Sequence, residues 1–372
     1  MSFGIDFFGA AGDARWGATQ YSMPCIDVWV YQFAGATTKS YPELEGATIR
    51  CETSPTSLVA TVTYPDGVPT ISVNNVGMLV YTAAITVFLE TLPASLESPY
   101  SWQIRNDDGT HAVSPLNTIL EFVESVGTTA TSPIGDICGS YSQIYGATSS
   151  YHATVSKDDY PSPPFVMIDL PEHPYFGGQL DIQDNLGTSS DWLLRISGTF
   201  ASAPTLYLFR NRGVTAPPTT GVGIALMDED GDCIFASSDS LLGFAGPPEV
   251  PGILEFDVPA ALSGSVTIGN LDQVWTPTAA LPANALVWMQ AKQIVAVEQC
   301  YSPGKGVPMD RVIREWTSGV CRYDTTDLML RLKTVTSFTR APEAINTEWF
   351  YGDINGGDYV GSCLIADKDR VI

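Results

Sequence analysis

Short runs of alternating or β-branched residues recur along the whole chain of 372 residues, and they constrain its fold more than any other feature. Glycine, proline, asparagine and aspartate cluster between the runs, where they favour turns. The clearest runs are IDVWVYQF (26–33), SLVATVTY (57–64), GMLVYTAAITVFLETL (77–92), DWLLRISGTF (191–200), TLYLFRN (205–211), ALVWMQAKQIVAVEQ (285–299) and LMLRLKTVTSF (328–338). We therefore predict a mainly β protein of two or three antiparallel β-sandwich or barrel-like domains, with at most one or two short helices.

One segment has helical periodicity. In PLNTILEFVESV (115–126), Ser114 is a suitable N-cap, Pro115 suits the first helical position and Gly127 can end the helix. Its apolar residues fall on one helical face: Leu116, Ile119, Leu120, Val123 and Val126. The pattern predicts a single helix over 115–126, packed on a sheet.

Two stretches far apart in the chain resemble each other. When Gly4 is set on Gly223, GIDFFGAAGDARWGAT pairs with GIALMDEDGDCIFASS, with identities at Gly4/Gly223, Ile5/Ile224, Gly12/Gly231 and Asp13/Asp232. Each stretch has the pattern of a strand, a turn containing Gly-Asp, and a second strand. The pattern predicts two hairpins with the same structural role. The Asp66-Gly67 and Asp108-Gly109 pairs predict further hairpin turns.

The proline-rich segment 214–221 separates these two stretches and is the best domain boundary. We predict an N-terminal β-domain over 1–95 with one Gly-turn hairpin and a middle β-domain over 96–215 with the helix. A C-terminal β-domain over 216–372 would carry the second hairpin.

The formal net charge of −23 and the pI of about 4.2 imply repulsion from phosphate backbones and anionic membrane surfaces. We expect no nucleic-acid partner and no membrane insertion. An acidic decoy that imitates DNA is disfavoured because the acids are diluted among Gly, Pro, Ser and Thr. One segment, 300–340, is locally basic, with seven Lys and Arg against four Asp and Glu. These bases either lie as ordinary solvated charges on strands or dock on a neighbouring acidic subunit.

The seven cysteines lack any metal-ligand spacing, and their odd number is typical of small buried side chains in a chain folded under reducing conditions. The N-terminus has neither the basic nor the apolar region of a secretory signal. No apolar stretch is long enough to span a bilayer. We expect synthesis in the cytoplasm and no cofactor.

An acidic cluster in the second hairpin is a weak candidate metal site. Asp228, Asp230 and Asp232 alternate as in a calcium loop, and Asp239 falls at the twelfth position. Glycine, however, stands at the fourth position instead of the sixth. The corresponding N-terminal turn, GAAGDA, keeps one acid, so the interpretation as a hairpin tip is favoured over a metal site.

Catalytic motifs are absent from the sequence. The three histidines form no zinc pattern and no GxSxG motif occurs. Neighbouring acids and aromatics could serve a glycosidase: Asp181, Asp184 and Asp191 beside Trp192, or Glu348 and Asp353 beside Trp349 and Tyr351. Such neighbours arise by chance in this composition, so we predict no catalytic residues. A carbohydrate-binding or glycan-hydrolysing β-domain protein remains the alternative.

Three blocks resemble a poorly characterised family of tailed-bacteriophage virion proteins from the tail-tip and tail-fibre region. They are FGIDFFGAAGDARW near the N-terminus, the apolar strand, acidic Gly-turn and second strand over 224–237, and the LIAD segment at 364–367. The resemblance implies a structural virion protein of the tail tip, baseplate or fibre. It would be a homo-oligomer, plausibly a trimer, that binds other tail proteins, with host surface glycan as a possible ligand and no catalytic residues.

Overall fold

The fold is given by a computed structural model of the chain. The structure describes residues 7–8, 14–16, 24–32, 37–54, 59–74, 82–91, 104–105, 111–113, 120–131, 149–169, 179–184, 190–198, 202–211, 225–227, 233–236, 242, 253–257, 274–275, 284–289, 293–299, 311–322, 328–340 and 360–368.

The mainly β prediction is confirmed. The described residues form 26 strands in eight sheets, and every strand pair is antiparallel. Each of the seven predicted runs contains a strand. Two 3-10 turns, η1 (Pro42–Leu44) and η2 (Pro65–Gly67), are the helical elements of this part of the chain.

The N-terminal part is a sandwich of two three-stranded sheets. One has the order β3-β8-β5, with β3 Cys25–Gln32, β8 Thr82–Thr91 and β5 Thr48–Ser54. The other has the order β4-β7-β6, with β4 Thr37–Ser40, β7 Thr70–Asn74 and β6 Val59–Thr63. Between β6 and β7, Asp66 and Gly67 both have positive φ (53° and 83°), so the predicted Asp-Gly turn is confirmed.

Two larger sheets form the centre of the molecule. The six-stranded sheet has the order β11-β17-β14-β22-β26-β20: β11 Leu120–Gly127, β17 Thr205–Asn211, β14 Phe165–Asp169, β22 Ala285–Met289, β26 Val360–Asp367 and β20 Ile253–Asp257. The four-stranded sheet has the order β12-β13-β16-β15: β12 Thr129–Thr131, β13 Ser149–Ser156, β16 Asp191–Gly198 and β15 Gln179–Asp184.

The six-stranded sheet is buried on both faces in its middle strands. Phe165 of β14 packs edge-on against Phe88 of β8, with ring centroids 5.4 Å apart, which joins this sheet to the N-terminal sandwich. Alternation places Val166 and Ile168 on the opposite face, in the core cluster that includes the buried residues of β13 and β16. Burial on both faces explains the unbroken apolar runs FVMI and LYLF.

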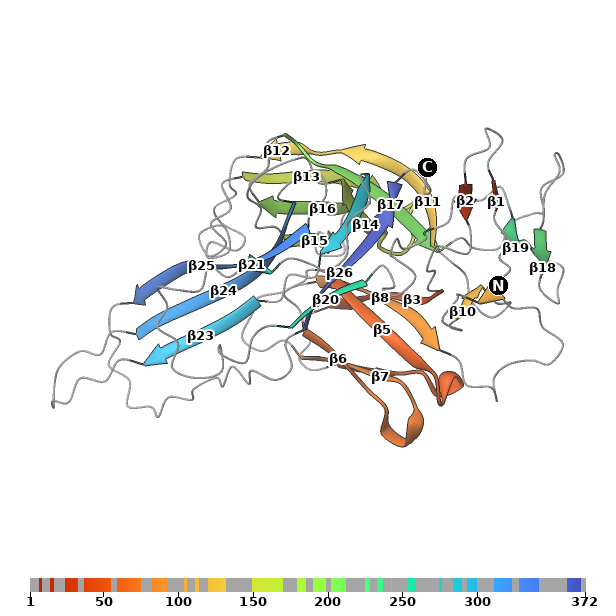
Figure 1. Cartoon of the computed structure of the whole chain (residues 1–372), viewed down its shortest axis with the longest axis horizontal. Helices are drawn as coiled ribbons and strands as arrows, with labels where there is room; N and C mark the ends of the chain where they lie inside the picture. The colour runs from red at the N-terminus through yellow and green to blue at the C-terminus, as the bar shows by residue number, and fades with distance from the viewer. Residues whose placement is uncertain are drawn as a thin grey trace.

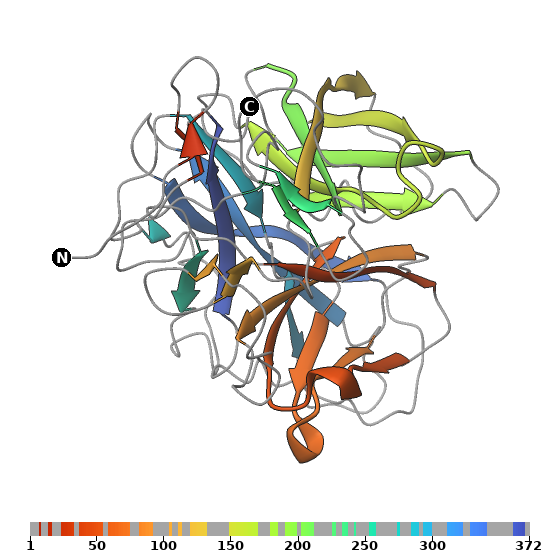
Figure 2. The same cartoon turned by 90° about the vertical axis from the view of Figure 1, so that its right-hand side faces the viewer.

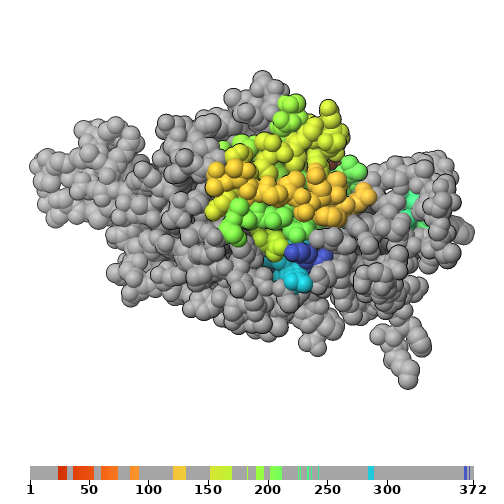
Figure 3. Space-filling view, turned by 90° about the horizontal axis from the view of Figure 1, so that it is seen from above, coloured from red at the N-terminus to blue at the C-terminus, as the bar shows by residue number. Residues whose placement is uncertain are grey.

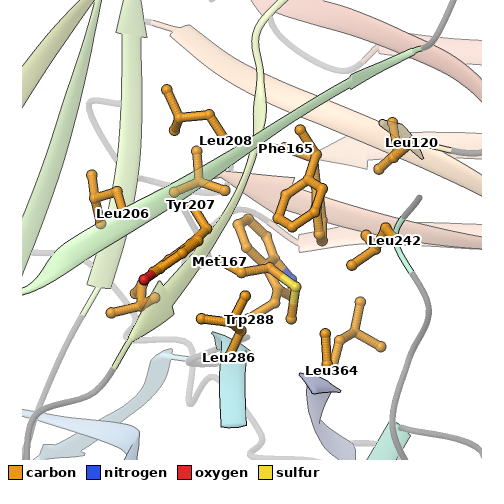
Figure 4. Close-up of a cluster of buried hydrophobic side chains, with 14 of the residues drawn as sticks. Leu120, Phe165, Met167, Leu206, Tyr207, Leu208, Leu242, Leu286, Trp288 and Leu364 are labelled. Carbon is orange, nitrogen blue, oxygen red and sulfur yellow. The ribbon is translucent and has the colours of Figure 1, made fainter. Parts of the chain in front are cut away.

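The figures show this layering. In Figure 2 the N-terminal sheets (red to orange) lie below the yellow-green strands of residues 120–211. Figure 3, seen from above, shows side chains of residues 120–130 running across those of 150–169 and 202–211. Figure 4 shows Phe165 and Met167 of β14 meeting Trp288 of β22 inside the core.

The remaining strands form a four-stranded sheet and three two-stranded sheets at the two ends of the view in Figure 1. On the left, β21-β25-β24-β23 comprises β21 Val274–Trp275, β25 Leu328–Arg340, β24 Arg311–Arg322 and β23 Gln293–Gln299. On the right lie three pairs: β1 Phe7–Phe8 with β2 Ala14–Trp16, β9 Ile104–Arg105 with β10 His111–Val113, and β18 Ala225–Met227 with β19 Cys233–Ala236.

The helix prediction over 115–126 is wrong for residues 120–126, which belong to strand β11; residues 114–119 lie outside the described residues. The strand contains a β-bulge: Phe122 pairs with Phe209 and Glu124 with Leu208, so Val123 is an extra residue. Leu120 pairs with Asn211 and Val126 with Leu206, so these two apolar residues lie on opposite faces of the strand and not on one helical face.

Strands on both sides of the predicted boundary at 215/216 belong to a single sheet. In the six-stranded sheet, Ile168 of β14 pairs with Val287 of β22 and Asp169 pairs with Leu286. Strands from 120–211 and from 253–367 therefore share one sheet and one core.

Candidate functional site

The two predicted Gly-turn hairpins form antiparallel pairs with the same register. Phe7 pairs with Trp16 and Phe8 with Ala14 in the first hairpin, with a register shift between Phe7 and Phe8. When the difference between Gly4 and Gly223 is added to each of these residue numbers, the result is the pairing of the second hairpin. There Leu226 pairs with Phe235 and Met227 with Cys233, with the register shift between Leu226 and Met227. The hairpin prediction is confirmed, including the equivalence of the two stretches.

The weak metal candidates Asp228, Asp230 and Asp232 fall between β18 and β19 in the sequence and lie outside the described residues. Within the described part of the chain, no three His, Cys, Asp or Glu side chains form a group that could hold a metal ion.

The double substitution Asp228→Asn/Asp230→Asn is expected to leave stability within about 0.5 kcal/mol of the wild type, with or without Ca²⁺, because acids at a hairpin tip are surface charges. Thermal unfolding in Ca²⁺ and in chelator is the measurement. A stability loss seen only in Ca²⁺ would instead establish a metal site.

A pocket of about 190 Å³ is the candidate binding site. It opens where β3 of the N-terminal sandwich meets β11, β17 and the proline-rich turn before β14. The residues that line it are Val28, Leu120, Tyr160, Pro161, Ser162, Pro163, Phe165, Phe209, Arg210 and Asn211. Its walls thus combine buried aromatic and aliphatic side chains with a few polar groups, as small-ligand sites do.

Hydrogen bonds hold the proline-rich turn beside the pocket. The Trp192 Nε1–H donates to the Tyr160 carbonyl (2.7 Å), and the Tyr160 hydroxyl donates to Glu124 (3.1 Å). Burial and this bond to a carboxylate raise the pKa of Tyr160 above its usual range, so its phenol stays protonated. Pro161 and Pro163 restrict φ, which further stiffens the turn.

Arg210 is the charged group of the pocket. It donates to the Asp159 carbonyl (3.3 Å), and its Nε lies 3.9 Å from Glu121. Its side chain is 45% exposed, so the guanidinium can also reach a ligand. The lining also offers the Ser162 hydroxyl, so the pocket can bind a ligand by hydrogen bonds.

A buried carboxylate joins the N-terminal sandwich to the six-stranded sheet. Glu52 of β5 is 1% exposed and accepts a hydrogen bond from Trp288 Nε1 (3.1 Å). Arg50 lies 3.6 Å from the other carboxylate oxygen and also pairs with Glu90 (3.0 Å). Hydrogen bonding and an opposite charge offset the cost of burying this acid, so the cluster is structural.

Two further ion pairs lie nearer the surface. Asp27 accepts from Lys39 and from the Tyr41 hydroxyl (2.7 Å), and Lys39 lies over the Trp29 ring at 5.4 Å. Lys368 pairs with Asp169 at 2.7 Å, and this hydrogen bond raises the pKa of Lys368.

The cysteines that the structure describes with their side chains fit the expectation of small buried side chains. Cys25 and Cys233 are buried and Cys51 is partly buried, and none of the three forms a disulfide bond. Burial raises the pKa of Cys25 to about 12. Burial and the neighbouring Glu52 raise the pKa of Cys51 as well.

Cys25 is expected to make stability fall as the pH rises from about 9 to about 12. Below that range the thiol is neutral in both the folded and the unfolded state. Within the range the thiol of the unfolded state loses its proton first, so the free energy of unfolding falls by up to about 1.4 kcal/mol per pH unit. Denaturant titrations of the wild type and Cys25→Ala across this range measure the effect. Parallel stability curves for the two proteins would contradict the assignment.

Of the two groups of acids and aromatics considered for glycosidase chemistry, the structure describes the one around Trp192. Trp192 is only 4% exposed and lies in the core, with Lys157 4.7 Å from its ring. Asp181 and Asp184 lie on the neighbouring strand β15, opposite Arg195 and Trp192. The group Glu348, Trp349, Tyr351 and Asp353 lies outside the described residues.

Sequence reasoning missed the pocket. The turn YPSPPF (160–165) was visible as a proline-rich break, but nothing local indicated that β3 and β17 would enclose it.

Comparison with family models, with curated proteins and with solved structures gives no match to this chain. Over the described residues, the structure contains no helix with the length and apolar character needed to cross a membrane.

Proposed function

We propose that the protein is a structural component of a bacteriophage tail, at the tail tip, baseplate or fibre. There it assembles with copies of itself, plausibly as a trimer, and with other tail proteins, and it contributes to host attachment. Its location would be the virion tail.

The observation that carries the proposal is the repeated hairpin. Two of the three blocks that resemble tail proteins form β1-β2 and β18-β19, whose registers coincide pair for pair. The third block, Leu364–Asp367, lies in β26, in the middle of the six-stranded sheet. All three blocks thus correspond to structural elements rather than to a reactive site, which supports a building role.

The test is location in the particle. Gold-labelled antibody against the purified protein is expected to decorate the tail end of phage particles in electron micrographs. Label on the capsid, or absence of the protein from purified particles by mass spectrometry, would contradict the proposal.

The pocket favours a second candidate function, the binding of a neutral sugar. Ser162, Asn211 and Arg210 can bond to ring hydroxyls above the apolar floor. Anionic sugars are disfavoured because Glu121 lies 3.9 Å from Arg210 and Glu124 accepts a hydrogen bond from Tyr160, another residue of the lining.

Saturation-transfer NMR with neutral and acidic monosaccharides tests this second function. Arg210→Ala is expected to weaken binding of a neutral sugar about tenfold, through loss of a hydrogen bond to a charged group. Release of new reducing ends from host polysaccharide would identify a hydrolase instead.

A further inference from the structure

The strand pair β24-β25 is oppositely charged to the rest of the chain. These two strands contain six of the 18 Lys and Arg but one of the 41 Asp and Glu, a net charge of +5. The remainder of the chain therefore carries −28. Figure 1 shows β23, β24 and β25 extending away from the central sheets, and among the described strands their extensive contacts are with one another and with β21.

The register collects four of the six bases on one face of this sheet. Arg311 pairs with Arg340, Thr317 with Lys333 and Gly319 with Arg331. Positions 311, 317 and 319 differ by even numbers, so they share a face of β24, and each register partner shares the face of its opposite residue. We call Arg311, Arg331, Lys333 and Arg340 the basic face. The one acid of the strand pair, Glu315, lies on the same face by the same rule, so the face has four bases against one acid.

A β-bulge is what makes the basic face possible. Glu315 pairs with Thr336 and Trp316 with Thr334, so Val335 is an extra residue in β25. Without it, strict alternation would put Arg340 on the face opposite to Arg331 and Lys333. The bulge shifts the phase by one and restores all of them to one face.

The basic face has an unfavourable element when it is alone. Arg311 and Arg340 stand directly opposite each other, and like charges in that position destabilise a strand pair. An acidic surface against the face would remove this repulsion.

We propose that the basic face binds an acidic surface on a second copy of this chain. Each copy carries both a basic face and a body of charge −28, so copies complement one another. A polyanion such as DNA offers negative charge to the face but no positive surface in return, whereas two copies of the chain each supply a basic face and an acidic body. The proposal specifies the surface for the self-association in the proposed function. Particle location and self-association are measured separately, so either can fail alone.

The test is sedimentation velocity of the full chain at about 0.01 M and about 1 M salt, between which the Debye length falls from about 30 to about 3 Å. The wild type is expected to associate at low salt and to dissociate at high salt. Arg331→Glu/Lys333→Glu is expected to weaken association about tenfold or more.

The matched control is Arg314→Glu/Arg322→Glu, which changes the net charge equally on the opposite face of the same strand pair. It should leave association within about threefold of the wild type, less than 1 kcal/mol. Circular dichroism verifies folding. Arg311→Glu/Arg340→Glu reverses the same face at other positions if the first variant fails to fold.

Three results would overturn the proposal. They are a wild type that is monomeric at both salt concentrations, association that is insensitive to salt, and equal weakening by the two charge reversals. A monomeric wild type that binds heparin through the basic face would assign the face to a polyanion.

Discussion

Replacing Trp288 with alanine is expected to lower the free energy of unfolding by about 3–5 kcal/mol, as for other large aromatic side chains removed from a core. Trp288 is 2% exposed and its ring lies 4.8 Å from that of Phe165. It also donates to Glu52, a residue 236 positions earlier in the chain. The substitution therefore removes both packing and a polar link between the six-stranded sheet and the N-terminal sandwich. Urea denaturation followed by circular dichroism measures the loss.

A second variant separates the polar link from the packing. Trp288→Phe keeps an aromatic ring but removes the indole N–H, so a buried carboxylate loses one hydrogen bond, at a cost of about 1–3 kcal/mol. A double-mutant cycle with Glu52→Gln should give a coupling energy of about 0.5–3 kcal/mol. Additive losses would show that the two side chains do not act together.

Phe165→Ala is expected to lower the free energy of unfolding by about 3–5 kcal/mol, because it leaves a cavity where three parts of the chain meet. Phe165 is 1% exposed and contacts the rings of Phe88, Phe209 and Trp288, at centroid distances of 5.4, 6.4 and 4.8 Å. The same residue lines the pocket, so the variant should also lose any ligand bound there.

The control for Phe165→Ala is Thr154→Ala on the exposed side of β13, which should change stability by no more than about 0.5 kcal/mol. Thermal and urea unfolding of both variants provide the comparison. If Phe165→Ala were as stable as Thr154→Ala, the central core would not be the joint between the sheets.

Local patterns in the sequence were sufficient for most elements. The alternating runs became strands, Asp66-Gly67 adopted the positive φ values of a hairpin turn, and the two Gly-turn stretches formed hairpins of identical register. These features depend on backbone geometry within a few residues, which is why composition and spacing determine them.

Strand β11 shows where local patterns fail. Its apolar residues at 120, 123 and 126 have helical spacing, yet pairing with β17 makes it a strand with a bulge at Val123. The gain from completing a sheet edge outweighs a weak helical preference, and the competing partner lies about eighty residues away in the sequence.

The sequence by itself determined the strands, the turns and the repeated hairpin of this protein. Only the tertiary structure decided which strands share a sheet, and thereby where the pocket and the buried charge lie. In TIRCETS (48–54), Arg50 and Glu52 alternate with apolar residues and read as a solvent face, but the six-stranded sheet covers it and Trp288 meets Glu52 there. Periodicity fixes which side chains point the same way; what covers them depends on strands distant in the chain, because pairing partners are chosen by the packing of the whole core.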